Sequence, residues 1–258
     1  MPLPSYSVVI PVYNNGGELR RAVESVLSQS LSPESILLIN DCSAKPETKA
    51  LLGQLSELDR VTVIHLQRNL GAAGARNVGI YHAEAPIVAF LDADDAWVKD
   101  KMECQLSLMQ AAQCTAVGAR VSTDRRVLFA GKDIVELKVT DLLVRHVIQT
   151  SSFVAKRDAL LSIGGFPEGR RYAEEGDLYL KMLSVGRVLF MNRPLVIYGD
   201  EIGLNSSRGL SSHKTKMFLG ELANLNNCQK RAQIGILSWL GLLIFTTIRY
   251  LRRILLAN

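Results

Sequence analysis

The chain has 258 residues and a formal net charge of +5, and 48% of its residues are hydrophobic while 21% are charged. This balance excludes a disordered chain and predicts a globular protein with a substantial core. The Lys and Arg residues are scattered, so charge alone does not choose among a nucleic acid, a phosphorylated metabolite and an anionic membrane. Four dispersed cysteines and four histidines lack zinc-type spacing, which favours free thiols in a reducing compartment. The N-terminus has no basic region and a short apolar run, so we expect no signal peptide.

Strand and helix patterns alternate regularly through the first 112 residues. Short β-branched and aliphatic runs alternate with segments whose apolar residues recur at helical spacing. We expect strands at 6–12, 35–39, 61–66 and 87–91, and helices at 17–30, 46–58, 71–83 and 99–112. The alternation predicts a Rossmann-like α/β fold, in which a mostly parallel central sheet has helices on both faces. The ligand site of such a sheet lies beyond the carboxyl ends of its strands.

The second half of the chain is less regular. We expect strands at 115–123, 125–132, 151–156, 187–191 and 195–200, and helices at 140–148, 156–163 and 173–186. There is no internal repeat and no low-complexity linker. We therefore expect one α/β domain over residues 1–230, followed by a separate helical tail over residues 231–258.

The tail contains an uncharged run from Ala232 to Ile248 that is apolar on every side of a helix, followed by Arg249, Arg252 and Arg253. Such a helix is buried either in protein or in lipid. Seventeen residues is the short end of the ~17–25 that span a bilayer. One interpretation is a helix that packs on the domain or on a second subunit. We favour peripheral membrane contact through residues 232–253 over a full span.

Polar residues follow the first two expected strands. Pro11, Tyr13 and Asn14 lie where the first strand gives way to a loop, and alone they are typical of an ordinary βα turn. Asp41 comes directly after the second strand. An acid at that place binds a ribose hydroxyl or a base edge in nucleotide-binding sheets, or it caps a turn together with Ser43. The residues alone leave both interpretations open.

A glycine-rich segment, NLGAAGARNVG at 69–79, follows the third expected strand. Its small residues allow close backbone approach, and the N–H groups of a helix N-terminus suit phosphate. Arg76 adds a cation that can bind a phosphate or a base. The glycine spacing differs from that of the dinucleotide-binding fingerprint.

Three carboxylates, Asp92, Asp94 and Asp95, follow the apolar run at 87–91. Oxygen ligands of this kind suit Mg²⁺ or Mn²⁺, which bind one or two carboxylates together with substrate phosphates. A solvated acidic turn that caps the next helix is the alternative. A strand followed by D-x-D also marks phosphohydrolases that use the first Asp as nucleophile. Those carry the motif on the first strand and Thr or Val where Ala96 stands here, so we do not favour that class.

Taken in order, SVVIPVYNN, INDCS, NLGAAGARN and FLDADD resemble the motifs of glycosyltransferase family 2. The resemblance is close over the first hundred residues and looser to about residue 200. It implies a GT-A fold that binds a nucleotide-diphosphate sugar, with Asp41 on the nucleoside and Arg76 on the nucleotide. It also implies that Asp92 and Asp94 are the D-x-D pair for Mn²⁺ or Mg²⁺, Asp94 being the direct ligand. The donor-binding residues implied are Pro11, Tyr13, Asn14, Asp41, Asn69, Gly71, Arg76, Asp92 and Ala93.

The family also implies an inverting displacement, which needs a carboxylate to take the proton from the acceptor hydroxyl. The usual E-D pair corresponds here to Glu174 and Glu175 in AEEGDLYL. Glu175 is the candidate base, although it is one methylene longer than the usual Asp, and Asp177 is the second candidate. The alternative is that these acids merely stabilise a helix N-terminus. Arg170 and Arg171 just before them either meet a phosphate or are solvated, and we do not count His213 among the metal ligands.

The sequence thus predicts a metal-dependent inverting glycosyltransferase that moves a sugar, from a UDP-sugar in our preferred interpretation, to a hydroxyl of a glycan or lipid-linked acceptor. We expect it to act in cell-surface polysaccharide biosynthesis, peripherally on the cytoplasmic face of a membrane and as a homo-oligomer, without nucleic acid. The competing hypothesis is a catalytically inactive nucleotide-sugar-fold subunit that scaffolds a membrane glycan-synthesis complex. The altered E-E pair is its only support.

Overall fold

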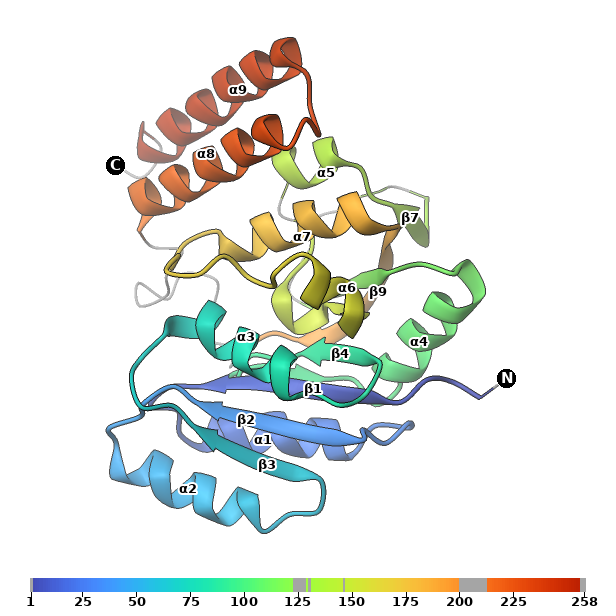
Figure 1. Cartoon of the computed structure of the whole chain (residues 1–258), viewed down its shortest axis with the longest axis vertical. Coiled ribbons are helices and arrows are strands. Elements are labelled where there is room, and N and C mark those ends of the chain that lie inside the picture. The colour runs from blue at the N-terminus through green and yellow to red at the C-terminus, as the bar shows by residue number, and fades with distance from the viewer. Residues whose placement is uncertain (1, 123–128, 130, 146, 200–212, 256–258) are drawn as a thin grey trace.

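The computed structural model describes residues 2–122, 129, 131–145, 147–199 and 213–255, and its centre is a mixed sheet with helices on both sides (Figure 1). Within these residues the strand order is β3-β2-β1-β4-β8-β6-β9-β5, and β7 pairs with β9. The strands are β1 (Tyr6–Val12), β2 (Ser35–Asn40), β3 (Val61–His65), β4 (Ile87–Phe90), β5 (Ala96–Trp97), β6 (Ala116–Val121), β7 (Ile134–Glu136), β8 (Val154–Lys156) and β9 (Val188–Ile197). The helices are α1 (Gly17–Leu27), α2 (Pro46–Ser56), α3 (Gly71–His82), α4 (Lys101–Ala112), α5 (Val139–Val144), η1 (Thr150–Ser152), α6 (Arg157–Ser162), α7 (Glu174–Val185), α8 (Lys214–Lys230) and α9 (Ile236–Leu255).

The parallel part of the sheet is where the site must lie. Strands β1 to β4 are mutually parallel and follow the expected alternation with helices, which confirms the predicted fold class. From β1 the chain adds β2 and β3 on one side and then returns to place β4 on the other. The carboxyl ends of β1 and β4 therefore diverge into loops at a topological switch point, the usual position of a ligand crevice.

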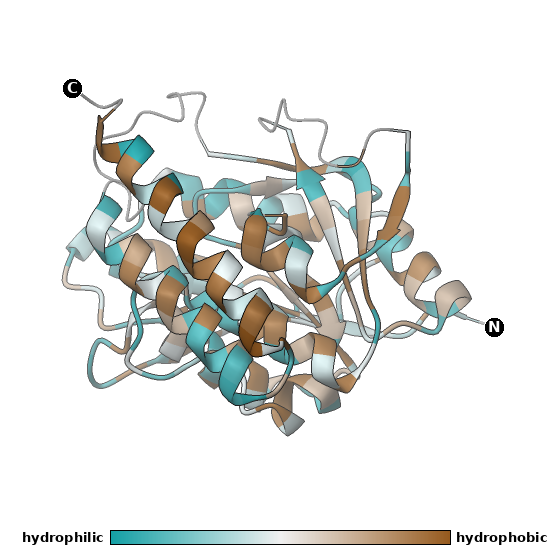
Figure 2. Cartoon of the chain, turned by 90° about the horizontal axis from the view of Figure 1, so that it is seen from above, coloured by the Kyte–Doolittle hydropathy of each residue, from teal (hydrophilic) through white to brown (hydrophobic). Residues whose placement is uncertain are grey.

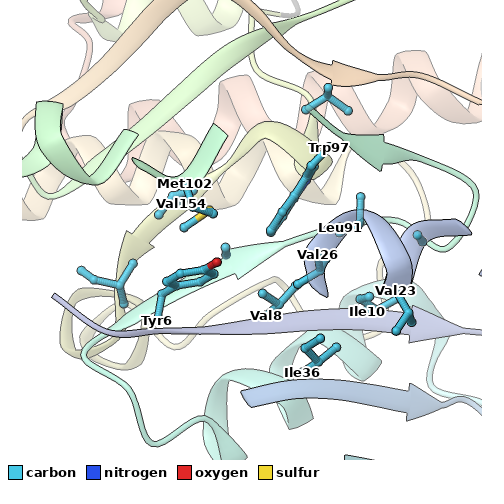
Figure 3. Packing of buried hydrophobic residues seen from close by; sticks show 14 of the residues in the cluster. Tyr6, Val8, Ile10, Val23, Val26, Ile36, Leu91, Trp97, Met102 and Val154 are labelled. Atoms are coloured by element: carbon cyan, nitrogen blue, oxygen red, sulfur yellow. The ribbon is translucent and has the colours of Figure 1, made fainter. Parts of the chain in front are cut away.

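Each face of the sheet has its own core layer. Strand β1 is buried along nearly its whole length, and its alternate side chains point to opposite faces. Val8 and Ile10 lie in one layer with residues of α1, α2 and α4 (Figure 3). Val9 lies in the other layer with residues of α3, α6 and α7. Because both faces are covered, the strands read as continuous apolar runs.

The second half departs from the sequence expectation at several points. Strand β9 runs unbroken from Val188 to Ile197, whereas two short strands were predicted. Helix α5 ends at Val144, four residues early. The sequence pattern did not indicate β5, β7 or α8. Most of the strand predicted at 125–132 lies outside the described residues.

Helices α8 and α9 form a hairpin beside α5 and α7, at the end of the molecule farthest from β3 (Figure 1). The stretch that looks apolar on every side in the sequence is divided in the structure: one side of α9 packs on α8 and the other is exposed. None of the helices in the described part has the length and apolarity that a membrane crossing requires. The division of the chain at residue 230 stays a prediction.

Candidate active site

The loops after β1 and β2 are tied together by side chains that bind main-chain groups. Asn14 has a φ of 57°, the left-handed conformation that Asn adopts more readily than most residues. Its Oδ1 accepts hydrogen bonds from the N–H groups of Ala44 and Lys45 at 2.9 and 3.1 Å, and its own N–H donates to Ser43 Oγ. Tyr13, next to it, is 54% exposed. This crosslink gives the first two loops one fixed geometry.

Asp41 holds the N-terminus of α3. Its two carboxylate oxygens accept hydrogen bonds from the backbone N–H groups of Leu70 and Gly71 at 2.6 and 2.8 Å, and Asn69 donates to its carbonyl. Asp41 is only 2% exposed, and its charge stabilises the helix N-terminus. A nucleoside contact by Asp41 stays a prediction, since a carboxylate has lone pairs beyond these two bonds. Gly71 adopts a φ of +74° in this turn, a conformation that is readily accessible to glycine because it has no Cβ.

Arg76 joins the acids of the two halves of the chain. Its guanidinium donates to Asp92 Oδ1 at 2.5 Å and lies 3.8 Å from Glu174 Oε1. The ring of Phe166 covers it, 5.3 Å from the guanidinium carbon. Burial lowers the pKa of Arg76, but the charge of Asp92 and its hydrogen bond, with the charge of Glu174, outweigh that effect and raise the pKa. The buried cation therefore fixes the distance between the D-x-D loop and the start of α7.

Ser151 of η1 holds the D-x-D turn through hydrogen bonds. Its hydroxyl accepts a hydrogen bond from the backbone N–H of Asp92 and donates one to the carboxylate of Asp95. Its carbonyl accepts from the indole of Trp97 at 2.8 Å. Asp95 is 2% exposed, and burial, then the charge of Asp92, raises its pKa to about 7. Asp95 therefore helps to stabilise the turn through its hydrogen bond with Ser151. The sequence pattern gave no signal for Ser151, since its partners lie more than fifty residues away.

Asp94 differs from its neighbours because it is exposed, while Ala93 beside it is buried. Its carbonyl accepts a hydrogen bond from Arg21 at 2.6 Å. Although the residue is exposed, nearby protein atoms partly desolvate its carboxyl group, and this effect, then the charge of Asp92, raises the pKa of Asp94. Two nearby carboxylates that repel each other in this way fit a divalent cation, which offsets their charge with oxygen ligands. Among the described residues no third His, Cys, Asp or Glu joins them in a group that could hold a metal.

The three acids at the start of α7 have different surroundings. Glu174 is 7% exposed, and burial, then the charge of Glu175, raises its pKa to about 7. Asp177 is turned to α8, where its carboxylate binds Asn227 and Arg231 at 3.2 and 3.0 Å. Glu175 is half-buried and lines a small pocket between α5, α7, α8 and α9. The structure thus brings Glu174 to Arg76 and holds Asp177 in contacts with another helix.

The remaining basic candidates lie around the same helices. Arg170 donates to Asn224 and to the carbonyl of Gly220, so its guanidinium fastens α8 to the loop before α7. Arg171 is exposed and lies 3.5 Å from Asn69. His213 packs edge-on against Tyr172. Of the two arginines, only Arg171 extends toward Asn69 in the loop before α3.

These strand-end loops lie inside a segment that matches a known family. Residues 7–155, more than half of the chain, match the family described as Glycosyl transferase family 2. The chain belongs to glycosyl transferase family 2. In Bacillus subtilis (strain 168), TuaG carries the name of a teichuronic acid biosynthesis glycosyltransferase, and this family 2 chain is 41% identical to it over 112 residues. The match covers 43% of the chain and 44% of TuaG, so the chain spans less than half of that relative.

Two solved structures share the fold of this family 2 protein. S. aureus TarS 1-349 in complex with UDP-GlcNAc has a TM-score of 0.69 and 18% identity, with 86% of this chain and 67% of that one covered. The mannosyltransferase PcManGT from Pyrobaculum calidifontis, in complex with GDP-Man and Mn²⁺, has a TM-score of 0.70 and 17% identity, with 89% and 65% covered. At these identities the likeness shows the fold alone, and it supports the GT-A architecture that the motifs imply.

Proposed function

We propose that the protein is an inverting glycosyltransferase that moves a sugar from a nucleotide-diphosphate sugar to a hydroxyl of a glycan or lipid-linked acceptor. The observation that carries the proposal is the buried Arg76, which contacts Asp92 on the donor side and Glu174 beside the candidate base. One cation thereby brings the D-x-D loop and the start of α7 to a single site. The named relative TuaG supports a role in cell-surface polysaccharide biosynthesis.

The donor is proposed to lie across the carboxyl ends of β1, β2 and β4. Exposed Tyr13 offers a ring for a base, and the loop at Asn69 and Gly71 offers close backbone approach. The fold neighbours hold UDP-GlcNAc and GDP-Man, so both bases fit this architecture, and a UDP-sugar remains our choice.

Asp92 and Asp94 are proposed to hold Mn²⁺ or Mg²⁺, with Asp94 as the direct ligand. Their oxygen donors fit either ion, and PcManGT was solved with Mn²⁺. When bound, the cation offsets the negative charge that develops on the leaving diphosphate. Arg76 holds Asp92 in place for that role.

Glu175 is proposed as the general base. It takes the proton of the acceptor hydroxyl while that oxygen bonds to the anomeric carbon, on the face opposite the nucleotide. The bond from the anomeric carbon to the diphosphate oxygen breaks with its electron pair, so the configuration inverts. Glu174 has a pKa raised to about 7, and it therefore holds a proton in part of the population near neutral pH, which reduces its repulsion of Glu175. Asp177 has the weaker claim, because Arg231 and Asn227 bind its carboxylate.

The test is nucleotide release with a suitable donor and acceptor in the presence of Mn²⁺. Glu175→Gln is expected to lower kcat by about 10²–10⁴ without weakening UDP binding. Asp177→Asn serves as the comparison and is expected to lower stability more than turnover per folded molecule. If Glu175→Gln keeps full turnover while Asp177→Asn loses it, the base assignment is wrong. If the wild-type protein binds nucleotide but turns over no donor, the scaffold hypothesis replaces the enzyme.

The proposal includes a peripheral position on the cytoplasmic face of a membrane, where an enzyme meets a lipid-linked acceptor. Exposed apolar residues on α9 support it. Self-association into a homo-oligomer is a further part of the proposal, and sedimentation of the purified protein tests it.

A further inference from the structure

The hairpin of α8 and α9, residues 213–255, accounts for the net positive charge of the chain. It holds seven of the 30 Lys and Arg residues but only one of the 25 Asp and Glu residues. The remainder of the chain therefore has 23 basic and 24 acidic residues and is nearly neutral. The single acid, Glu221, is bound by Arg249 and Arg253 at 2.8 and 3.3 Å. The hairpin is thus a localised cationic element and not part of an evenly basic surface.

One face of α9 is fixed against the protein. Tyr250 stacks on Phe218 of α8 with ring centroids 4.2 Å apart, and Thr246 is 4% exposed. Arg249 donates to the carbonyl of Val144 at 2.7 Å. These contacts determine which way the helix faces.

The opposite face of α9 is an exposed apolar stripe. The exposed fractions are 81% for Leu237, 60% for Ile244 and Ile248, 51% for Leu251 and 74% for Leu255. The spacing of these residues keeps them on one side of a helix. At 1.5 Å per residue the stripe is ~27 Å long, and its apolar bands are visible along the helix in Figure 2. A contiguous exposed apolar surface of this size marks an interaction site.

The C-terminal end of the stripe carries a cation. Arg252 lines a shallow surface groove together with Ile248, Leu251 and Leu255, so a basic residue borders the apolar stripe. Helix α9 contains no acidic residue. Apolar side chains bordered by arginine, without a balancing acid, match the boundary between acyl chains and anionic headgroups.

We infer that α9 docks the protein on an anionic membrane surface, lying parallel to the bilayer with its Leu237–Leu255 stripe in the headgroup and acyl boundary. Phosphate-bearing headgroups meet Arg252 at the C-terminal end of the stripe. Arg249 on the inner face of the same helix lines the pocket that also contains Glu175. The benefit of docking rests on the proposed function. A docked α9 would hold the pocket that contains Glu175 next to the membrane surface that presents a lipid-linked acceptor.

Co-sedimentation of the full chain with vesicles tests the inference. We expect at least about tenfold tighter binding to phosphatidylcholine vesicles containing ~30% phosphatidylglycerol than to pure phosphatidylcholine. The double change Ile244→Ser and Ile248→Ser alters two exposed side chains and is expected to weaken binding at least about tenfold. Arg252→Gln is expected to weaken binding to the anionic vesicles about fivefold, because each cation near the surface contributes about 1 kcal/mol, and to leave binding to neutral vesicles unchanged.

Matched controls on other helices separate this site from general surface properties. Leu161→Ser on α6, an exposed apolar position, and Arg20→Gln on α1 are expected to bind vesicles as the wild type does. Equal binding to both vesicle types, or no loss in the α9 variants, would overturn the inference. A dimer in sedimentation that dissociates in the Ile244 and Ile248 variant, without vesicle binding by the wild type, would assign the stripe to a second copy. Nucleotide binding measured on the same variants shows independently whether the proposed function stands.

Discussion

The proposed donor side of the molecule, up to β6, and the proposed acceptor side, from η1 to α9, stabilise their polar residues in different ways. On the donor side Asn14 and Asp41 bind backbone N–H groups of neighbouring loops. On the proposed acceptor side Asp177 and Arg170 bind side chains of α8 and of Arg231 directly after it, some fifty residues away. The shape of the proposed donor side is therefore set by adjacent βα units, whereas the shape of the proposed acceptor side depends on how the helices pack together. Arg76 is a buried charged link between the two sides, through its contacts with Asp92 and Glu174.

Breaking that link is expected to have the largest effect. Arg76→Ala leaves Asp92 and the buried Glu174 without their cation, and we expect the free energy of unfolding to fall by about 3–5 kcal/mol. Turnover should fall as well. Chemical denaturation measures the change, with Arg20→Ala as the control, because Arg20 is exposed and contacts only Gln54 at 2.6 Å among the hydrogen bonds described. A loss of less than about 1 kcal/mol in Arg76→Ala would show that the two sides are not coupled through this residue.

The tight packing of the donor side can be tested with a pair of glycines. A Cβ at Gly79 of α3 would lie 2.3 Å from Cγ1 of Val9 on β1, while one at Gly53 of α2 would meet nothing within 4 Å. Gly79→Ala is expected to destabilise the protein by about 1–3 kcal/mol through overpacking. Gly53→Ala is expected to stabilise it by about 0.5–1 kcal/mol, since alanine favours the helix. Thermal melting of both variants checks the contrast, and equal shifts would contradict it.

The buried acid at the junction gives a smaller effect that depends on pH. The pKa of Glu174 is raised from 4.5 to about 7 in the folded protein, so between these values the folded state binds a proton that the unfolded state has lost. The contribution of Glu174 to the free energy of unfolding therefore falls as pH rises from about 4.5 to 7. In Glu174→Gln, the decrease in the free energy of unfolding between pH 4.5 and 7 is expected to be smaller by on the order of 1–2 kcal/mol. The part of the decrease that Asp95 causes is expected to remain.

Chemical denaturation at pH 4.5, 5.5 and 7 measures the slope of the free energy of unfolding against pH. Glu47→Gln, at an exposed position of α2, is the control and should keep the wild-type dependence. An unchanged slope in Glu174→Gln would mean that Glu174 is not buried with Arg76 in the way described.

The same contrast explains what the sequence could predict. Strands β1 to β4 and their helices follow from local apolar spacing, and the strand-end motifs fall at the switch point because parallel strands align their carboxyl ends. Residue Ser151 could not be predicted, since its contacts to Asp92, Asp95 and Trp97 arise only when η1 packs beneath β4. Helix α8 was missed because few of its residues are buried and its apolar pattern is weak. The burial of Asp177 against α8 was hidden for the same reason.

Nucleotide binding tests the central claim that the strand-end loops form a donor site with a divalent cation. The melting temperature of the purified chain is measured with UDP, GDP, UDP-sugars and GDP-mannose, each with and without Mn²⁺. We predict a rise with at least one nucleotide that requires Mn²⁺ and is lost in Asp94→Asn, since a ligand that binds only the folded state stabilises it. No shift with any nucleotide, in the presence or absence of Mn²⁺, would contradict the account.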